Sequence, residues 1–241
     1  MAGVSRRSGV GQIALVLSAV AGYELARRLI APDRSLAVAH ARDVLRWERA
    51  LHLAWEGPLQ QAFLHVPLAV DFLGLVYLSS QFVVTGVFFA WLYSRSPEAY
   101  WRFRDGFVVA TAFGLAVQWR YPVAPPRLAR IGVEDTLARL LHVDLASRLT
   151  DPVAAVPSLH AGWALGVGLG MALYARGRVC RAAGVLYPVF VILATVVTGN
   201  HFLFDAGAGV AAVLLGLALA EMLRPSHGAK LVAATRGGAV R

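Results

Sequence analysis

Long apolar segments alternate with short polar ones along most of the chain. The apolar runs fall at about residues 10–23, 72–93, 107–119, 159–174, 182–198 and 202–223. A helix needs about 20 mostly apolar residues to cross a bilayer, so runs of this kind are typical of membrane-spanning helices. The pattern predicts an all-α, polytopic membrane protein, built as a bundle of six transmembrane helices.

The composition supports this prediction. Of 241 residues, 58% are hydrophobic and 15% are charged, whereas a soluble domain carries about 25% charged residues. The formal net charge of +9 would suggest nucleic acid as the partner of a soluble protein. Here the arginines flank apolar runs, so we expect contacts with anionic membrane lipids and none with nucleic acid.

The first apolar run has two interpretations. Arg6 and Arg7 precede it, and Ala19-Val20-Ala21 lies near its end, which is the pattern of a cleaved signal peptide. A retained first transmembrane helix explains the same pattern, because a polytopic protein can insert without cleavage. We expect the helix to be retained.

An amphipathic helix is expected within residues 35–55. Its apolar face holds Val44, Leu45, Leu51 and Trp55, and its basic stripe holds Arg42, Arg46 and Arg49. Such a helix can lie on the membrane surface, which is the interpretation we favour. It can also pack on its neighbours as an ordinary amphipathic helix.

Two polar clusters bracket the fourth and fifth apolar runs. Pro157-Ser158-Leu159-His160 comes before them, and Gly199-Asn200-His201 comes after them, with Asp205 four residues later. If each run crosses the membrane once, the chain goes over and comes back. Both clusters then lie at the same membrane face and form one candidate reaction centre.

Two arginines, Arg120 and Arg127, follow the third apolar run and reach the same face. The prolines between them are Pro122, Pro125 and Pro126. Since proline cannot continue a helix, they fix the direction in which Arg127 leaves the bilayer. A guanidinium offers a planar fork that matches phosphate oxygens.

This combination suits phosphoryl transfer. His201 and Asp205 share a helix face, so the carboxylate can bind one ring nitrogen and leave the other as a nucleophile. Ser158 and the N–H groups at the start of its helix can bind an anion, and His160 can protonate a leaving oxygen. We see no Cys, His and carboxylate cluster with metal-ligand spacing, so we expect no metal and no cofactor.

Each of these residues also has an ordinary structural explanation. A histidine at a helix end is usually structural, Ser158 suits a helix cap, and Arg127 can reach toward lipid headgroups. Their joint occurrence at one predicted face, in a chain with few other intramembrane polar groups, favours the functional interpretation.

The motifs resemble those of the phosphatidic acid phosphatase type 2 superfamily, whose signatures are Lys-x6-Arg-Pro, Pro-Ser-Gly-His and Ser-Arg-x5-His-x3-Asp. Arg120-x6-Arg127 keeps the first spacing, with arginine for lysine and Leu128 for proline. Pro157-Ser158-Leu159-His160 keeps the second signature, with leucine in place of glycine.

The third signature is kept in part. His201-x3-Asp205 matches its end, while Thr195 stands where the family has arginine. These departures resemble the inositolphosphorylceramide synthase (aureobasidin-resistance) branch, whose members transfer a headgroup phosphate ester. The missing arginine leaves fewer donors for the phosphate, which favours transfer of a substituted phosphate over hydrolysis of a monoester.

The resemblance implies a mechanism. His201 attacks phosphorus and forms a phosphohistidine, His160 protonates the departing oxygen, and Asp205 orients His201. The phosphate-binding residues are then Arg127, Ser158, Arg120 and Asn200.

The implied function is that of a metal-independent, integral-membrane lipid phosphatase or phosphotransferase. Its substrate is a lipid phosphate, and the acceptor is water, a polyol or a lipid. An inositolphosphotransferase is the more specific alternative. A non-catalytic transporter of anionic lipids, or a scaffold, is another, but a transporter needs a polar path across the bilayer and the polar residues here gather at one end.

The expected organisation has four parts. They are a first transmembrane helix with its flanks (1–34), an interfacial helical region (35–71), the catalytic membrane bundle (72–223) and a polar tail (224–241). Basic residues are nearly equally divided between the two sides, but those in short loops favour a cytoplasmic location for both termini. The site then faces the extracytoplasmic side of the cell membrane.

Overall fold

The computed structural model describes residue 22 and residues 33–141 and 153–224. Its helices are α2 (Arg34–Ala50), α3 (Glu56–Leu64), α4 (Pro67–Ser79), η1 (Ser80–Val84), α5 (Thr85–Arg95), α6 (Pro97–Arg120), η2 (Pro126–Leu128), α7 (Thr136–Leu141), α9 (Leu159–Tyr174), α10 (Arg178–Val197) and α11 (Leu203–Met222). Among these residues the only extended pairing is an isolated parallel bridge between Val123 and Ala154. The predicted all-α class is confirmed. The helix expected at 10–23, apart from residue 22, and the tail after residue 224 lie outside the described residues.

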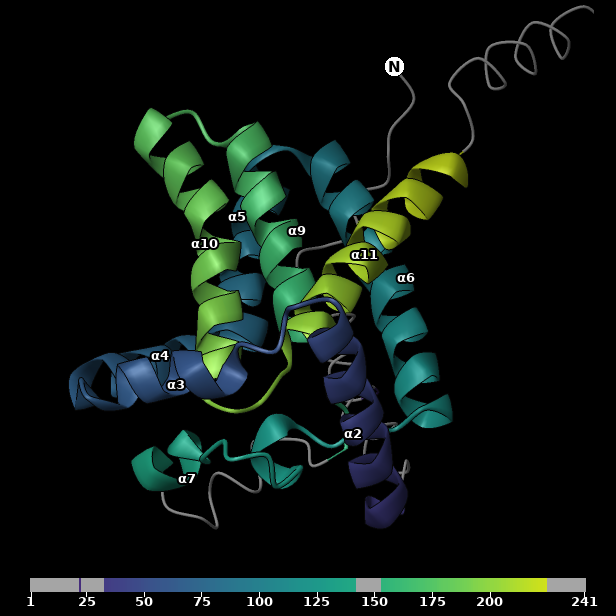
Figure 1. Cartoon of the computed structure of the whole chain (residues 1–241). Helices are drawn as coiled ribbons and strands as arrows, with labels where there is room; N and C mark the ends of the chain where they lie inside the picture. The colour runs from purple at the N-terminus through teal and green to yellow at the C-terminus, as the bar shows by residue number, and fades with distance from the viewer. Residues whose placement is uncertain (1–21, 23–32, 142–152, 225–241) are drawn as a thin grey trace, which may run out of the picture.

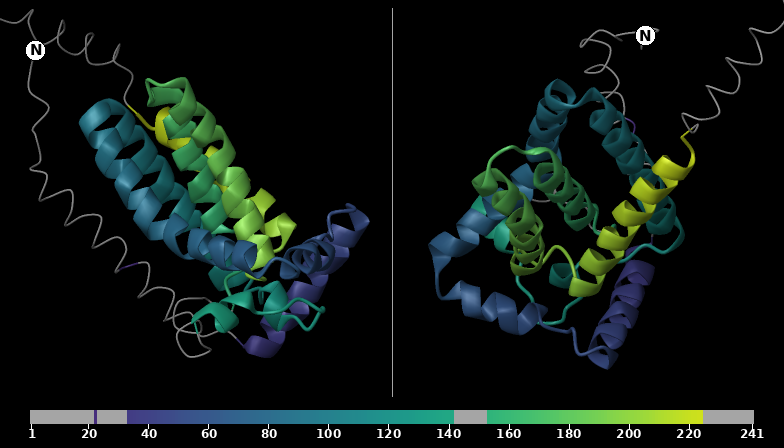
Figure 2. Two further views of the ribbon diagram at one scale, coloured as in Figure 1. Left: turned by 90° about the vertical axis from the view of Figure 1, so that its left-hand side faces the viewer. Right: turned by 90° about the horizontal axis from the view of Figure 1, so that it is seen from above.

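The upright helices form a bundle around α9 (Figures 1 and 2). α9 packs against α10 and α11, and α11 packs along α6. The helices α2, α3 and α7 lie at one end of this bundle. α9 and α11 begin at that same end and α10 finishes there, so the turn between α10 and α11 is close to the start of α9.

Glycines allow α9 to approach its neighbours closely. A Cβ atom on Gly162 would lie 2.6 Å from the backbone oxygen of Gly209 on α11. On Gly166 it would lie 2.3 Å from the ring of Phe107, and on Gly170 2.3 Å from the ring of Phe88. The four-residue spacing of these glycines thus permits close helix packing, with a different neighbouring helix at each glycine.

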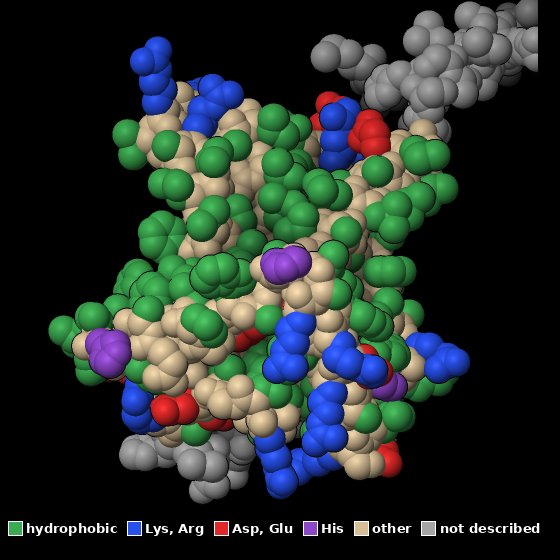
Figure 3. Space-filling model, viewed as in Figure 1, with side chains coloured by type: hydrophobic (Ala, Val, Ile, Leu, Met, Phe, Trp, Pro, Cys, Tyr) green, Lys and Arg blue, Asp and Glu red, His purple; other side chains and the backbone are tan. Residues whose placement is uncertain are grey.

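Within the described residues, three helices are long and apolar enough to cross a membrane. They are the continuous helix Pro67–Arg95, which contains α4, η1 and α5, together with α10 and α11. α9 is apolar but has 16 residues. Figure 3 shows apolar side chains covering the helices of the bundle, with arginines and acids toward its two ends. The apolar helices indicate a membrane protein, whereas the six spans remain a prediction.

α6 differs from its prediction, since it begins at Pro97 rather than near residue 107. The side chain of Ser96 accepts a hydrogen bond from the N–H of Ala99, and proline suits the first helical position. Arg102 lies 3.0 Å from Glu98 and 3.4 Å from Glu221 of α11. Glu98 and Arg102, whose charges indicated a polar connection before residue 107, are therefore paired along the first turns of α6.

The other elements lie close to their expected positions. The helix expected at 159–174 is α9, those at 182–198 and 202–223 are α10 and α11, and the one at 72–93 lies within Pro67–Arg95. The polar connection after residue 129 contains the short helix α7. The rest of that connection, residues 142–152, lies outside the described residues.

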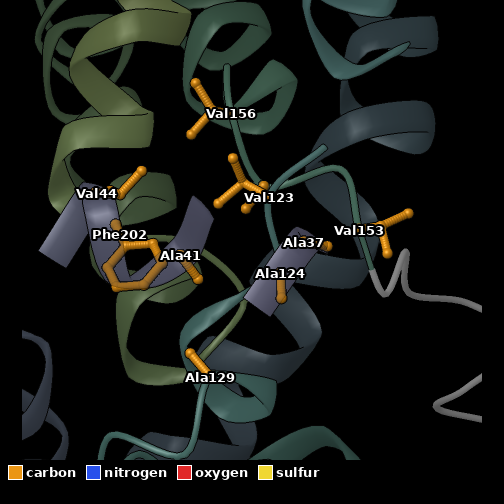
Figure 4. Close-up of a cluster of buried hydrophobic side chains, with 10 residues drawn as sticks. Ala37, Ala41, Val44, Val123, Ala124, Ala129, Val153, Val156 and Phe202 are labelled. Atoms are coloured by element: carbon orange, nitrogen blue, oxygen red, sulfur yellow. The ribbon is translucent and has the colours of Figure 1, made fainter. Parts of the chain in front are cut away.

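α2 packs on the protein through its small residues. Ala37, Ala41 and Val44 are fully buried against a cluster that includes Val123 and Phe202, as Figure 4 shows. Leu51 and Trp55, which were expected on the same face as Val44, are 57% and 59% exposed. Packing on neighbours therefore accounts for the middle of α2, and the apolar residues beyond its end remain available to a lipid surface.

Candidate active site

The two histidines of the sequence motifs come together at one end of the bundle. Their ring centroids are 5.7 Å apart, with the ring planes inclined by 55°. His201 is buried, and His160 is half-buried. His160 lies in the first turn of α9 and His201 in the turn between α10 and α11, so both helix ends contribute to the site.

The turn that carries His201 depends on Gly199. This glycine has φ +71°, and a Cβ atom there would lie 2.7 Å from the backbone oxygen of Glu134. The N–H groups of Asn200 and His201 both donate to the carbonyl of Thr195, at 3.0 and 3.1 Å. Thr195, which stands where the motif of the resembled family has arginine, therefore contributes a backbone acceptor that shapes the turn.

The imidazole of His201 is oriented by a backbone carbonyl. Its Nδ1 lies 2.9 Å from the carbonyl oxygen of Ala155 and 3.5 Å from Oδ2 of Asp205. A carbonyl can only accept a hydrogen bond, so Nδ1 is the donor and Nε2 of the neutral ring keeps its lone pair. The direct Asp205 contact expected from the sequence is thus shared with Ala155.

Asp205 has a second task in the fold. Its Oδ2 accepts from the N–H of Phe202 at 2.8 Å and caps the start of α11. Its backbone oxygen accepts from the N–H of Ser158 at 2.9 Å. Ser158 in turn caps α9, because its Oγ accepts from the N–H of Ala161 at 3.3 Å, which confirms the expected cap. These bonds fix the starts of α9 and α11 relative to each other.

Arg127 is tied to the same turn. Its backbone N–H donates to the oxygen of Gly199 at 3.1 Å, and its guanidinium donates to Oδ1 of Asn200. Its Nε lies 3.2 Å from Oδ2 of Asp135, and the side chain is 3% exposed. The guanidinium is therefore held beside the His201 turn, and Asn200 contacts it directly.

The structure brings six of the seven candidate residues together through these contacts. The seventh, Arg120, is exposed at the end of α6. Among the described residues, no hydrogen bond or ion pair joins Arg120 to the other six.

Two further residues support the site, and sequence patterns did not reveal them. The ring of Tyr77 on α4 stacks on His160, with centroids 4.3 Å apart and planes inclined by 16°. The amide of Gln60 on α3 donates to the backbone oxygens of Glu134 and Val197, each at 2.9 Å, and accepts from the N–H of Glu134 at 2.8 Å. Both side chains lie in apolar or amphipathic helices, where no local motif marks them.

Two glutamates were also missed. Glu48 of α2 and Glu56 of α3 are buried and accept hydrogen bonds from the first N–H groups of α11. Burial raises the pKa of Glu48 from its ordinary value of 4.5 to about 8. Burial also raises the pKa of Glu56. At neutral pH this acidic pair therefore keeps a proton next to the His201 turn.

The donor set of this site favours anion chemistry. Within the described part of the chain, no group of three or more His, Cys, Asp or Glu side chains is arranged to hold a metal ion. What the site offers instead is a free imidazole nitrogen, a second imidazole close to it, and a buried guanidinium.

Comparison with known proteins identifies the family. A family model described as the PAP2 superfamily matches residues 42–219, a range that contains all seven candidate residues. No curated protein and no solved structure gives a significant match. Members of the superfamily are generally phosphatases, which indicates phosphatase-type activity on phosphate esters. With most of its length matched by that model, this chain belongs to the PAP2 superfamily.

Proposed function

We propose that the protein is an integral-membrane enzyme that hydrolyses or transfers a lipid headgroup phosphate through a phosphohistidine on His201. One observation carries the proposal: Nδ1 of His201 faces the Ala155 carbonyl, while the ring of His160 lies 5.7 Å away, centroid to centroid. This arrangement supplies a nucleophilic Nε2 and a second imidazole able to move a proton.

The reaction has two steps. In the first, Nε2 of His201 forms a bond to phosphorus, the bond to the leaving oxygen breaks, and protonated His160 gives its proton to that oxygen. In the second, water or a hydroxyl group of an acceptor attacks phosphorus, His160 takes its proton, and the phosphorus–nitrogen bond breaks. The Ala155 carbonyl and the Asp205 carboxylate stabilise the positive charge on the His201 ring.

Arg127 and Ser158 bind the phosphoryl oxygens. The burial of the Arg127 guanidinium strengthens its attraction for an anion, because water screens it less. Asn200 holds Arg127 in place in addition to any contact with phosphate. Arg120 binds phosphate only if substrate draws its exposed side chain toward the site.

The substrate is a lipid phosphate, which enters the site from the surrounding membrane lipids. The side chain of Thr195 donates to the carbonyl of Ile192 at 2.8 Å and supplies no charge where the family has arginine. A site with one cation fewer suits a phosphodiester, which carries less charge than a monoester. This favours headgroup transfer of the inositolphosphorylceramide synthase type, with a polyol or lipid hydroxyl as acceptor, at the extracytoplasmic side of the cell membrane.

The test is turnover by purified protein in detergent against a panel of lipid phosphates, with and without inositol or glycerol. We expect release or transfer of phosphate that persists in EDTA and is inhibited by vanadate, which can mimic five-coordinate phosphorus. His160→Ala should slow reaction by about 10²–10⁴-fold with a lipid alkoxide leaving group and far less with an aryl phosphate. Full activity of His201→Ala would contradict the proposal and favour a non-catalytic lipid-binding role.

A further inference from the structure

The first turn of α11 is held by three carboxylates from three separate segments. The N–H of Phe202 donates to Asp205 at 2.8 Å, that of Leu203 to Glu56 at 2.9 Å, and that of Phe204 to Glu48 at 2.7 Å. Three successive orphan N–H groups, which a helix start leaves without partners, are thus satisfied directly after His201. We call Glu48, Glu56 and Asp205 the carboxylate clamp.

The clamp is buried. Glu48 and Asp205 are 0% exposed, and Glu56 is 2% exposed. Burying a charged carboxylate is costly unless it is paired or hydrogen-bonded, and one N–H bond per carboxylate does little to offset three such charges. A neutral acceptor would satisfy each of these N–H groups without the cost of a buried charge, so the presence of two additional buried acids at the same turn requires another explanation.

The carboxylates of Glu48 and Glu56 accept from the adjacent N–H groups of Phe204 and Leu203, so they lie close together. Two ionised carboxylates this close repel each other, and one shared proton removes the repulsion. Among the described residues, Oε2 of Glu48 is buried without a hydrogen-bond partner, which fits a neutral, protonated Glu48 beside an ionised Glu56. The pair then carries one negative charge and not two.

We propose that Glu48 and Glu56 are positioning residues for His201, which share one proton and hold the first turn of α11 so that the imidazole is placed for attack on phosphorus. This inference rests on the proposed function of His201 as the nucleophile. The shared proton prevents repulsion between the two carboxylates. The one negative charge that the pair keeps adds to that of Asp205 in stabilising the positive His201 ring formed during attack.

Protonation of the Glu48 and Glu56 pair should therefore control how turnover changes with pH. The charged groups that face Glu48 are Glu56 on α3 and Asp205 on α11, with His201 next to Asp205. When alkaline pH removes the shared proton, two buried carboxylates repel each other, the first turn of α11 shifts, and turnover falls. Burial raises the pKa of Glu48 to about 8, which places this decline at mildly alkaline pH.

The experiment measures pH–rate profiles for p-nitrophenyl phosphate with the full chain in detergent. Glu48→Gln has the shape of a protonated glutamate, since its oxygen can accept from Phe204 and its amide can donate to Glu56. We expect turnover within about threefold of wild type at pH 6 to 7 and loss of the alkaline decline. Glu48→Ala leaves both partners unsatisfied and should lower kcat by about tenfold or more. Glu98→Gln, at an exposed acid of α6, is the matched control.

The double variant Glu48→Gln/Glu56→Gln separates charge from shape. It keeps the hydrogen-bonding geometry but removes the negative charge, so the His201 ring should hold a proton less tightly and the acid limb should move to lower pH. A purely structural role predicts an unmoved acid limb. If Glu48→Ala does not fold, Glu48→Gln and the double variant still decide the question.

The outcomes separate the two proposals. If wild type turns over neither p-nitrophenyl phosphate nor any member of the lipid phosphate panel, or if His201→Ala turns over normally, the proposed function fails and this inference fails with it. If His201→Ala is inactive but the Glu48 and Glu56 variants keep the wild-type profile, only the positioning role of the pair is overturned.

Discussion

At the scale of single residues, the site depends on how two imidazoles are held. His201 is fixed through Nδ1 by a backbone carbonyl, which no side-chain substitution at Ala155 removes. His160 is held in another way, by the face of the Tyr77 ring at 4.3 Å. Stacking on this ring orients the His160 imidazole for the proton transfer of the first step.

Tyr77 therefore gives a prediction at this scale. Tyr77→Leu removes the ring and should lower kcat several-fold, because an aromatic pair is worth about 0.5–1.5 kcal/mol beyond its area. Tyr77→Phe keeps the ring face and should stay near wild type. The measurement is kcat on a lipid phosphate for both variants, with thermal unfolding as the check on folding. Equal loss in both would show that the hydroxyl group matters, and not the stack.

Residue chemistry was also the most predictable part of the site. His160, His201, Asp205, Ser158 and Arg127 were identified because their spacing forms motifs. Tyr77, Gln60, Glu48 and Glu56 were not, because their importance comes from α2, α3 and α4 contacting segments that lie 74 to 156 positions later in the chain. Such contacts between distant segments leave no local pattern in the sequence.

At the scale of elements, close helix packing sets the positions of the motifs. Gly162 of α9 lies against the backbone of Gly209 on α11, and a Cβ atom on Gly209 would lie 2.0 Å from the oxygen of Ser158. Backbone atoms cannot move aside as a side chain can. The α9–α11 contact therefore holds His160 and His201 at a fixed separation.

Gly162→Ala should destabilise the protein by about 1–3 kcal/mol, the usual effect of overpacking a core. The matched control is Gly207→Ala on α11, where a Cβ atom would meet nothing within 4 Å. Alanine favours a helix there by about 0.5–1 kcal/mol relative to glycine, so this variant should be neutral or stabilised. Thermal unfolding in detergent compares the two, and an unchanged midpoint for Gly162→Ala would mean that α9 and α11 can separate.

The boundaries of the helices show which features the sequence patterns could predict and which they could not. The apolar run at 159–174 matched α9 because its cap, Ser158, and its apolar length agree. α6 extended further than predicted because Arg102 pairs with Glu221 of α11, a tertiary contact that makes a charged segment compatible with a helix. The positions of α2 and α3 beneath the bundle likewise follow from packing.

At the scale of the whole molecule, α2 and α3 link the folding of the amino-terminal half to the site. Their glutamates are buried on α11, so protonation of the pair is coupled to folding. Glu48 binds its proton more tightly in the folded protein, where its pKa is about 8, than at its ordinary value of 4.5. Its contribution to stability is therefore fully present below pH 4.5 and is lost as pH rises toward 8.

This coupling can be measured by unfolding wild type and Glu48→Gln across the pH range. We expect the stability of wild type to fall relative to the variant as pH rises from about 4.5 to about 8, because only wild type must keep a buried proton. A constant difference across this range would show that Glu48 does not change its protonation on unfolding.

The central claim is that His201 becomes covalently phosphorylated. The most direct measurement is to mix the protein with phosphatidic acid labelled in its phosphate, quench with alkali, and locate the label by peptide mass spectrometry. We expect an acid-labile phosphate on His201 in wild type and none in His201→Ala. A label on another residue, or an undiminished phosphoenzyme in His201→Ala, would contradict the claim.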